Sequence, residues 1–178
     1  MAGKSLYILV EGNDDIQFFD RIIKPRIKGN YDSIILWDYA QKKKKNIKIK
    51  NFIRSIESMD ADYIYVSDIN NSPCVSEKKN NIKGKFRNID DNRIVIVVKE
   101  IESWYLAGLS DENAKKFKIR PSNIKDTNII SKEQFNVLIP ENYRDSRINF
   151  MIEILKYFCI ETGKQRNKSF KYFVDKYI

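Results

Sequence analysis

The segment Leu6-Tyr7-Ile8-Leu9-Val10-Glu11-Gly12-Asn13-Asp14-Asp15 decides the fold that this sequence predicts. Five apolar residues bounded by polar ones are typical of a strand buried on both faces. Gly12 allows the chain to turn sharply, and Asp14 or Asp15 falls where a helix would begin. Such a turn places Glu11 at the carboxyl end of a buried strand, the edge at which α/β sheets bind ligands.

The acidic residues at this turn also indicate a cation site. Asp15 follows Glu11 by four residues, so it can point back toward Glu11 from the first helical turn. Two converging carboxylates suit a hard divalent cation such as Mg²⁺. A simpler explanation remains open for Asp14 and Asp15, because acidic residues also stabilise the positive end of a helix dipole.

Strand-like and helix-like patterns alternate through the first part of the chain. Apolar runs predict strands over residues 6–10, 33–37, 63–66 and 93–98. Two amphipathic stretches between them predict helices through their apolar faces, Ile16, Phe19, Ile22 and Ile23 in one and Ile49, Phe52, Ile53 and Ile56 in the other. The pattern favours an α/β fold with a mostly parallel four-stranded sheet flanked by helices.

The polar segment 75–88 fits either a helix or a basic loop. Farther along, helices are expected around Trp104, over residues 111–117, after Ser131 and over residues 147–160 and 169–177, with a loop over 121–128. The apolar face expected for the helix over residues 147–160 consists of Ile148, Met151, Ile152, Leu155 and Phe158. We therefore expect an α/β core over residues 1–110 and a helical C-terminal portion over 111–178, packed together as one structural unit.

The composition limits which catalytic and metal-binding groups this chain can use. The chain has 178 residues, of which 42% are hydrophobic and 32% charged, and it lacks an apolar stretch long enough to cross a bilayer. A cytoplasmic protein without membrane partners is expected. There is no histidine and the two cysteines, Cys74 and Cys159, are far apart, which excludes Cys/His zinc sites and Ser-His-Asp or Cys-His catalysis. Carboxylates, lysines, hydroxyls and a metal ion remain.

The net charge of +9 points to a polyanionic partner, most simply nucleic acid. The abundance of Lys, Ile and Asn fits the bias of an AT-rich genome equally well, so the clustering of the charges decides. The residues predicted to hold nucleic acid are Lys42, Lys43, Lys44, Lys45, Lys83, Lys85 and Arg87.

Two later strands also end in acidic residues. Asp68 follows the third predicted strand, and Glu100 and Glu102 follow the fourth. Since parallel strands end at the same edge, Glu11, Asp68 and one of these two glutamates would meet there, and a cation would offset their repulsion. Alternatively, Asp68 closes an Asx turn, and Glu100 and Glu102 form a solvated first helical turn.

The order Glu11-Gly12-Asn13-Asp14-Asp15, Asp68-Ile69-Asn70 and Glu100-Ile101-Glu102-Ser103-Trp104 resembles the Toprim domain of topoisomerases, primases and related nucleases. It most resembles the small Toprim nucleases related to the overcoming-lysogenization-defect (OLD) family. The resemblance covers roughly the first 110 residues and implies a Toprim-like fold with a Mg²⁺ or Mn²⁺ site.

The resemblance also implies a role for each matching residue. Glu11 would be a metal ligand or general base, Asp15 a ligand of a second metal and Asp68 the first acid of an Asp-x-Asp pair. Asn70 takes the place of the second acid and offers only a neutral carbonyl, which weakens a two-metal site. Glu102 would be the acid that follows the next strand, with Glu100 as the alternative. Lys164 or Lys168 would be the basic group at the scissile phosphate.

The function expected is metal-dependent hydrolysis of phosphodiester bonds, in DNA rather than RNA, in genome defence or repair. Because the chain has no Gly-x-x-x-x-Gly-Lys-Ser/Thr loop, an ATPase or other defence-system partner would be a separate polypeptide. Two alternatives stay open. One is a non-catalytic nucleic-acid-binding module, which Asn70 favours, and the other is a primase-like nucleotidyltransferase.

Overall fold

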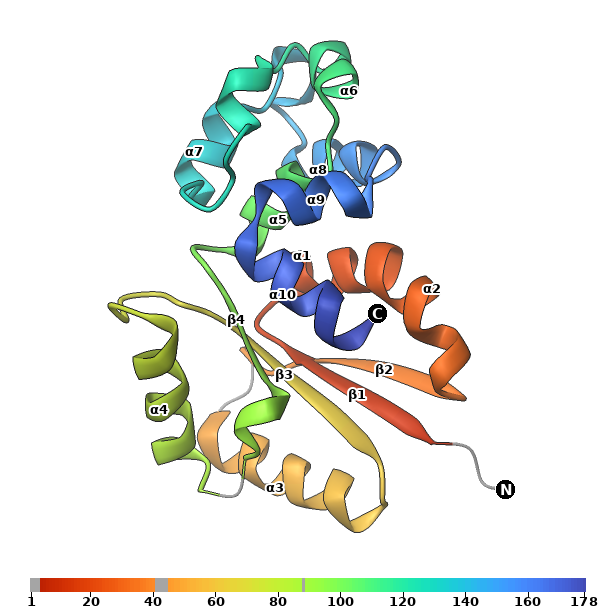
Figure 1. The fold of residues 1–178 in the computed structure, drawn as a ribbon, viewed down its shortest axis with the longest axis vertical. Coiled ribbons are helices and arrows are strands. Elements are labelled where there is room, and N and C mark those ends of the chain that lie inside the picture. The colour runs from red at the N-terminus through yellow and green to blue at the C-terminus, as the bar shows by residue number, and fades with distance from the viewer. Residues whose placement is uncertain (1–3, 41–44, 88) are drawn as a thin grey trace. The chain divides into compact units, whose positions relative to one another are not determined.

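The computed structural model describes residues 4–40, 45–87 and 89–178 (Figure 1). The chain divides into two compact units, Met1–Ile96 and Val97–Ile178. The sequence-based prediction placed the division near residue 110, which would have assigned the helix after the fourth strand to the first unit.

A four-stranded parallel sheet forms the centre of the first unit. Its strands are β1 (Ser5–Val10), β2 (Ser33–Asp38), β3 (Asp62–Asp68) and β4 (Ile94–Val97), in the order β2-β1-β3-β4. Leu9 in β1 pairs with Trp37 on one side and with Tyr65 on the other. All four predicted strands are present, and the prediction of a parallel α/β sheet is confirmed.

Helices flank both faces of this sheet, as Figure 1 shows. One face carries α1 (Asn13–Phe18), a π-helical turn (Phe19–Ile23), α2 (Lys24–Ile27) and a 3₁₀ turn (Lys28–Asn30). The other face carries α3 (Lys45–Ser58) and α4 (Val75–Lys85), and a 3₁₀ turn (Asp91–Arg93) leads into β4. The segment that the sequence left undecided is therefore a helix as far as Lys85.

The core beneath α3 and α4 explains why these helices form where they do. Ile49, Ile53 and Ile56 recur at helical spacing and are all buried. In the same cluster Tyr39 stacks on Tyr65, with the ring centroids 5.0 Å apart. α4 has little apolar surface and is anchored by its C-terminal end, where Ile82 and Phe86 are buried in the same cluster.

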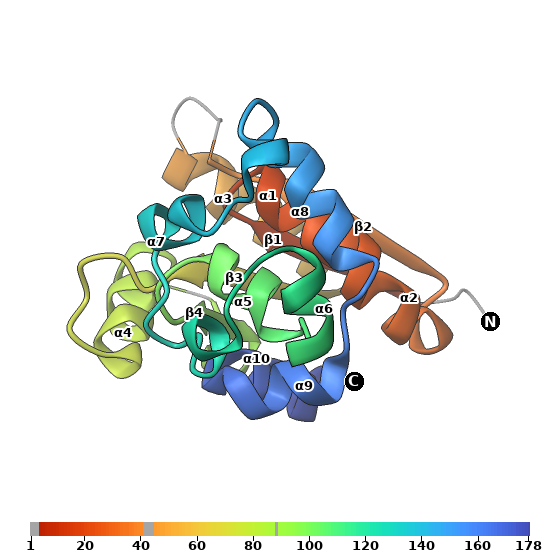
Figure 2. The same ribbon diagram turned by 90° about the horizontal axis from the view of Figure 1, so that it is seen from above.

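The second unit is helical. Its helices are α5 (Ile101–Ala107), α6 (Asp111–Lys116), α7 (Lys132–Val137), α8 (Arg147–Leu155), α9 (Ile160–Arg166) and α10 (Lys168–Tyr177), with 3₁₀ turns at Pro121–Ile124 and Glu141–Tyr143. α5 is buried throughout and contacts α7, α8 and α9 (Figure 2). The capping box predicted at Ser131 is confirmed, since the Gln134 N–H donates to Ser131 Oγ and the Ser131 N–H donates to Gln134 Oε1.

The helix predicted over residues 147–160 is present but shorter, and its predicted buried face is confirmed only at Met151 and Leu155. It ends at Leu155 because Phe158 forms a β-bridge with Leu109 and the Cys159 N–H donates to the Gly108 carbonyl. The buried side chains are those of Phe150, Met151, Ile154 and Leu155, whereas Ile148 is 59% exposed. The loop predicted over residues 121–128 contains a 3₁₀ turn, and α9 was not predicted.

A buried polar network holds the start of α10. Asn167 Oδ1 accepts hydrogen bonds from the Phe170 N–H at 3.0 Å and from Ser169 Oγ at 2.8 Å. Ser169 Oγ in turn accepts one from the Trp104 indole at 2.8 Å. Asn167 Nδ2 donates to Thr127 Oγ1 at 3.1 Å, so three distant segments share one set of hydrogen bonds. None of the helices within the described residues is long and apolar enough to span a membrane.

Candidate functional site

Glu11 follows the last residue of β1, at the carboxyl edge of the sheet. Its Oε2 atom is buried. The chain turns directly afterwards, where the Ile16 N–H donates to the Gly12 carbonyl at the start of α1. Asp15, 5% exposed, folds back over this turn, since a Cβ built on Gly12 would lie 3.9 Å from Asp15 Oδ2. Both acids of the opening motif thus lie at the edge predicted for them.

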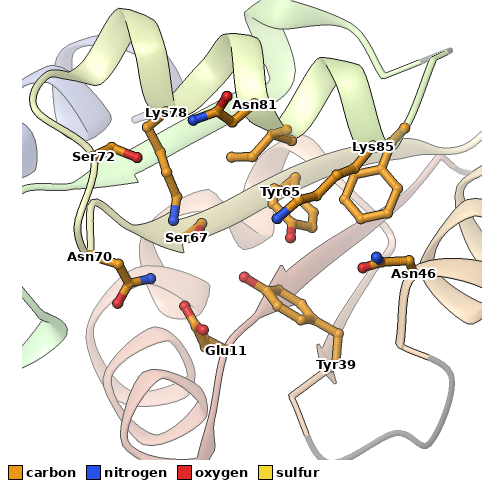
Figure 3. A pocket seen from close by; sticks show the side chains of 12 residues that line it. Glu11, Tyr39, Asn46, Tyr65, Ser67, Asn70, Ser72, Lys78, Asn81 and Lys85 are labelled. Carbon is orange, nitrogen blue, oxygen red and sulfur yellow. The ribbon is translucent and has the colours of Figure 1, made fainter.

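Glu11 lines a pocket of about 210 Å³ between the strand ends and α4 (Figure 3). The polar side chains come from the ends of β1 and β2, from β3 and the turn after it, and from α3 and α4. They are Glu11, Tyr39, Asn46, Tyr65, Ser67, Asn70, Ser72, Lys78, Asn81 and Lys85, and Ile82 and Phe86 complete the wall. The Glu11 carboxylate, the Tyr39 hydroxyl and the Lys78 ammonium group all point into the hollow (Figure 3). The pocket therefore combines one acid, two lysines, amides and hydroxyls.

Two stacked tyrosines form the inner wall of the pocket. Tyr39, 1% exposed, donates its hydroxyl hydrogen to the Val66 carbonyl at 2.8 Å. Burial is the main cause that raises the pKa of Tyr39 well above its ordinary value, and it raises the pKa of Tyr65 to about 12. The negative charge of Glu11 raises both pKa values further. At neutral pH the two phenols are therefore uncharged neighbours of the carboxylate.

Asn70 lies next to Glu11 in the pocket (Figure 3). Its backbone φ is 50°, in the left-handed region that asparagine tolerates better than most residues. Its side-chain amide donates to the Asp68 carbonyl at 3.2 Å, which closes the turn after β3. The residue in the place of the second acid thus has a turn-forming role and offers an amide oxygen near Glu11.

Asp68 ends β3, the strand next to β1, and its Oδ1 atom is buried. The register that pairs Leu9 with Tyr65, extended by two residues, sets Glu11 beside Ser67. Because successive side chains of a strand point to opposite faces, Asp68 belongs to the face opposite Ser67. Glu11 and Ser67 line the pocket, and Asp68 is not among the residues that line it.

Glu100 and Glu102, the acids predicted after β4, make contacts inside the helical unit. Glu100 Oε2 accepts a hydrogen bond from the Lys132 N–H at 2.5 Å. The Glu102 side chain is 4% exposed, and its Oε1 lies 2.5 Å from Arg147 Nη2. The Arg147 guanidinium also lies over the Phe135 ring, 5.5 Å from its centroid. These carboxylates hold the starts of α7 and α8.

Within residues 4–40, 45–87 and 89–178, no three Asp, Glu or Cys side chains gather as a metal-binding group. The two-metal set of carboxylates implied by the resemblance is therefore not assembled among them. The pocket itself fits a site for a single Mg²⁺ ion. Mg²⁺ is commonly held by one or two carboxylates with water and substrate phosphate oxygens, and Glu11 with the Asn70 amide and Ser67 hydroxyl oxygens is such a donor set.

The two lysines predicted near the scissile phosphate are in the helical unit. Lys164 pairs with Asp175 at 2.7 Å, and this hydrogen bond is the main cause that raises the pKa of Lys164. Lys168 is exposed at the start of α10 and borders a shallow hollow with Lys171, Tyr172 and Lys176. Their role at a phosphate stays a prediction.

The predicted basic residues of the first unit differ in their placement. Lys42, Lys43 and Lys44 lie outside the described residues, and Lys45 is the first residue of α3. Lys83 pairs with Asp91 at 3.0 Å, Arg87 is exposed, and Lys85 lines the pocket.

Sequence reasoning missed Lys78, Asn81 and Asn46 as pocket residues. Lys78, Asn81 and Lys85 are three and four positions apart, so they share one face once residues 75–85 are recognised as a helix. This spacing could have identified Lys78 and Asn81 as neighbours of the predicted Lys85.

The chain matches no protein-family model, and no curated protein and no solved structure matches it either.

Proposed function

We propose that this chain is a metal-dependent nuclease of Toprim type whose reaction centre is the Glu11 pocket. One observation carries the proposal: the Glu11 carboxylate, at the carboxyl end of a buried parallel strand, faces Lys78 and Lys85 across a polar pocket. An acid and lysines on opposite walls are suited to a phosphodiester that is bound together with a divalent cation.

The residues divide the work by their chemistry. Glu11 with the Asn70 and Ser67 oxygens would hold Mg²⁺ or Mn²⁺, which supplies charge neutralisation and an activated water. Lys78 would offset the negative charge that builds on the phosphoryl oxygens. Tyr39 and Tyr65, which stay neutral at pH 7, form the buried wall of the pocket beside Glu11.

The test is metal-dependent cleavage of single-stranded and plasmid DNA and of RNA, with Mg²⁺ or Mn²⁺. We expect Glu11→Gln to lower the cleavage rate by about 10²-fold or more, because it removes the charge without changing the shape of the side chain. Glu57→Gln is the matched control, because Glu57 is an exposed acid in the last turn of α3, at the opposite end of the sheet. This variant should cleave at the wild-type rate. Equal cleavage by both variants would mean that the pocket is not the reaction centre.

A non-catalytic nucleic-acid-binding module is the second candidate. It is favoured by the neutral Asn70 and by the lack of a three-acid group among the described residues. Binding of DNA or RNA without any cleavage, under both metals, would establish this alternative. The primase-like nucleotidyltransferase stays a weaker prediction.

A further inference from the structure

The lysines of α4 fall into two sets with different surroundings. Lys79 and Lys83, four residues apart, both pair with Asp91, at 3.4 and 3.0 Å. Lys78 and Lys85, with Asn81 between them, line the Glu11 pocket instead (Figure 3). Because an α-helix has 3.6 residues per turn, these three residues form one stripe along the helix.

Packing fixes the direction in which this stripe faces. Ile82 and Phe86 are 4% and 3% exposed, and the Phe86 ring packs against Tyr65 in β3, with the centroids 5.7 Å apart. The Asp91 pairs hold the other side of the helix. The buried Ile82 and Phe86 therefore turn the stripe of Lys78, Asn81 and Lys85 toward the strand ends.

The two ends of the stripe reach different parts of the pocket. Lys78, half-buried, extends toward Ser67 and Asn70 on the side of Glu11, and Lys85 extends from the other end of α4 toward Tyr65 (Figure 3). Among the residues that the structure describes, Lys85 has no ion-pair partner. A cation held by the fold beside a polar pocket, with its own side chain exposed, is available to an anionic ligand.

We propose that the α4 stripe, Lys78, Asn81 and Lys85, binds separate phosphates along a single nucleic-acid strand. Seven residues of helix separate the backbone positions of Lys78 and Lys85 by about 10.5 Å. This is about the length of three nucleotides of a stacked strand, which advances about 3.4 Å per nucleotide, so the two flexible side chains can reach different phosphates of one strand. Lys78 then contacts the phosphate next to Glu11, and Lys85 contacts one farther along the same strand. This placement of the reacting phosphate rests on the function proposed above.

The geometry selects a single strand. Lys78 is half-buried at the wall of the pocket, so a phosphate reaches it only by descending beside Ser67 and Asn70, which a strand does when it is not wound in a duplex. The stripe presents ammonium and amide groups in a line, and such contacts hold the backbone without reading the bases. The ligand class is therefore single-stranded nucleic acid of any sequence.

The test measures binding without metal, so that cleavage does not enter. 5′-Phosphorylated thymidine dinucleotides, tetranucleotides and octanucleotides, which carry two, four and eight phosphates, compete against a labelled octanucleotide in EDTA, for the wild type, Lys78→Gln and Lys85→Gln. Lys28→Gln is the control, with the same change of charge on an exposed residue of the first unit that precedes β2 and so lies at the opposite edge of the sheet. Thermal unfolding checks that all variants fold alike, and Lys85→Arg checks rescue by a second cation.

We expect Lys78→Gln to weaken binding of all three ligands, by roughly fivefold at low salt. Lys85→Gln should weaken the tetranucleotide and octanucleotide to a similar extent, leave the dinucleotide unchanged and lower the salt slope for the octanucleotide by about 0.7. Lys85→Arg should restore binding, and Lys28→Gln should equal the wild type.

The inference fails if Lys85→Gln weakens the dinucleotide as much as the octanucleotide, or if both pocket variants behave like Lys28→Gln. Its failure is distinguishable from that of the proposed function. Wild-type cleavage that depends on Glu11 but has no length-dependent Lys85 effect would refute only the stripe. Length-dependent binding without any cleavage would refute only the nuclease.

Discussion

Replacing Arg147 by methionine should destabilise the helical unit far more than the same replacement at Arg144. Arg147 Nη2 lies 2.5 Å from the Glu102 carboxylate, whose side chain is 4% exposed. Arg144 pairs with Glu141 at 3.3 Å, but the two side chains are 70% and 84% exposed. The two arginines are only three residues apart in the chain, so they allow a direct comparison of a buried and an exposed ion pair.

The magnitude follows from the burial of the partner. Removing one member of a buried pair costs about 3–5 kcal/mol. Because Arg147 itself is 24% exposed, we expect the lower part of that range, about 3–4 kcal/mol. The exposed pair should contribute up to about 1 kcal/mol. Replacing Glu102 and Arg147 together by methionine should recover most of the loss, since no buried charge then remains.

Urea unfolding followed by the fluorescence of Trp104 measures these differences, because Trp104 is fully buried in the helical unit. A Trp37→Phe background removes the signal of the other tryptophan, which belongs to the first unit. If Arg147→Met and Arg144→Met lower the free energy of unfolding equally, the structural role of the Glu102–Arg147 pair is refuted. A Glu102→Gln variant that keeps its stability but loses Mg²⁺ binding would instead support the metal role implied by the resemblance.

Two further predictions concern stability. Burial alone would raise the pKa of Asp62, but it is outweighed by hydrogen bonds from three side chains, those of Lys4, Tyr31 and Arg93, which hold this pKa below its usual value. The stabilisation is then present above the unfolded-state pKa of about 3.9 and lost as the pH falls through the lower folded-state value. Asp62→Asn should therefore lose stability at pH 7 and converge on the wild type in acid unfolding curves; a constant difference would contradict this. Gly108→Ala should cost about 1–3 kcal/mol, because the added Cβ overlaps the Phe158 ring, whereas Gly29→Ala, in open space, should not; equal thermal midpoints would refute the overlap.

The sheet could be predicted from the sequence because its signal is local. Each strand is a short apolar run, and the acids that end β1 and β3 mark the carboxyl edge directly. The meeting of Glu11 and Asp68 at this edge stays a prediction, because the register ends at Leu9 and Tyr65, short of both residues.

The partners of the acids could not be predicted, because they depend on tertiary contacts. Glu102 contacts Arg147 forty-five positions later, and Glu100 contacts the Lys132 N–H. Nothing in the pattern around either glutamate indicates these partners. The end of α8 was predicted wrongly for the same reason. The β-bridge of Phe158 with Leu109 ends the helix, although the apolar spacing in the sequence continues beyond Leu155.

The hydrogen bonds of Asn167 and Ser169 affect the order in which the two units can fold during synthesis. Trp104, Ser103 and Thr127 leave the ribosome well before the two residues that satisfy their polar groups. Until residues 167–174 emerge, the indole N–H of Trp104 has no buried acceptor at this position, and α5 lacks the cover of Phe170 and Phe173. The helical unit therefore completes its core late in translation, while the sheet of the first unit, whose strands end by residue 97, is free to form earlier.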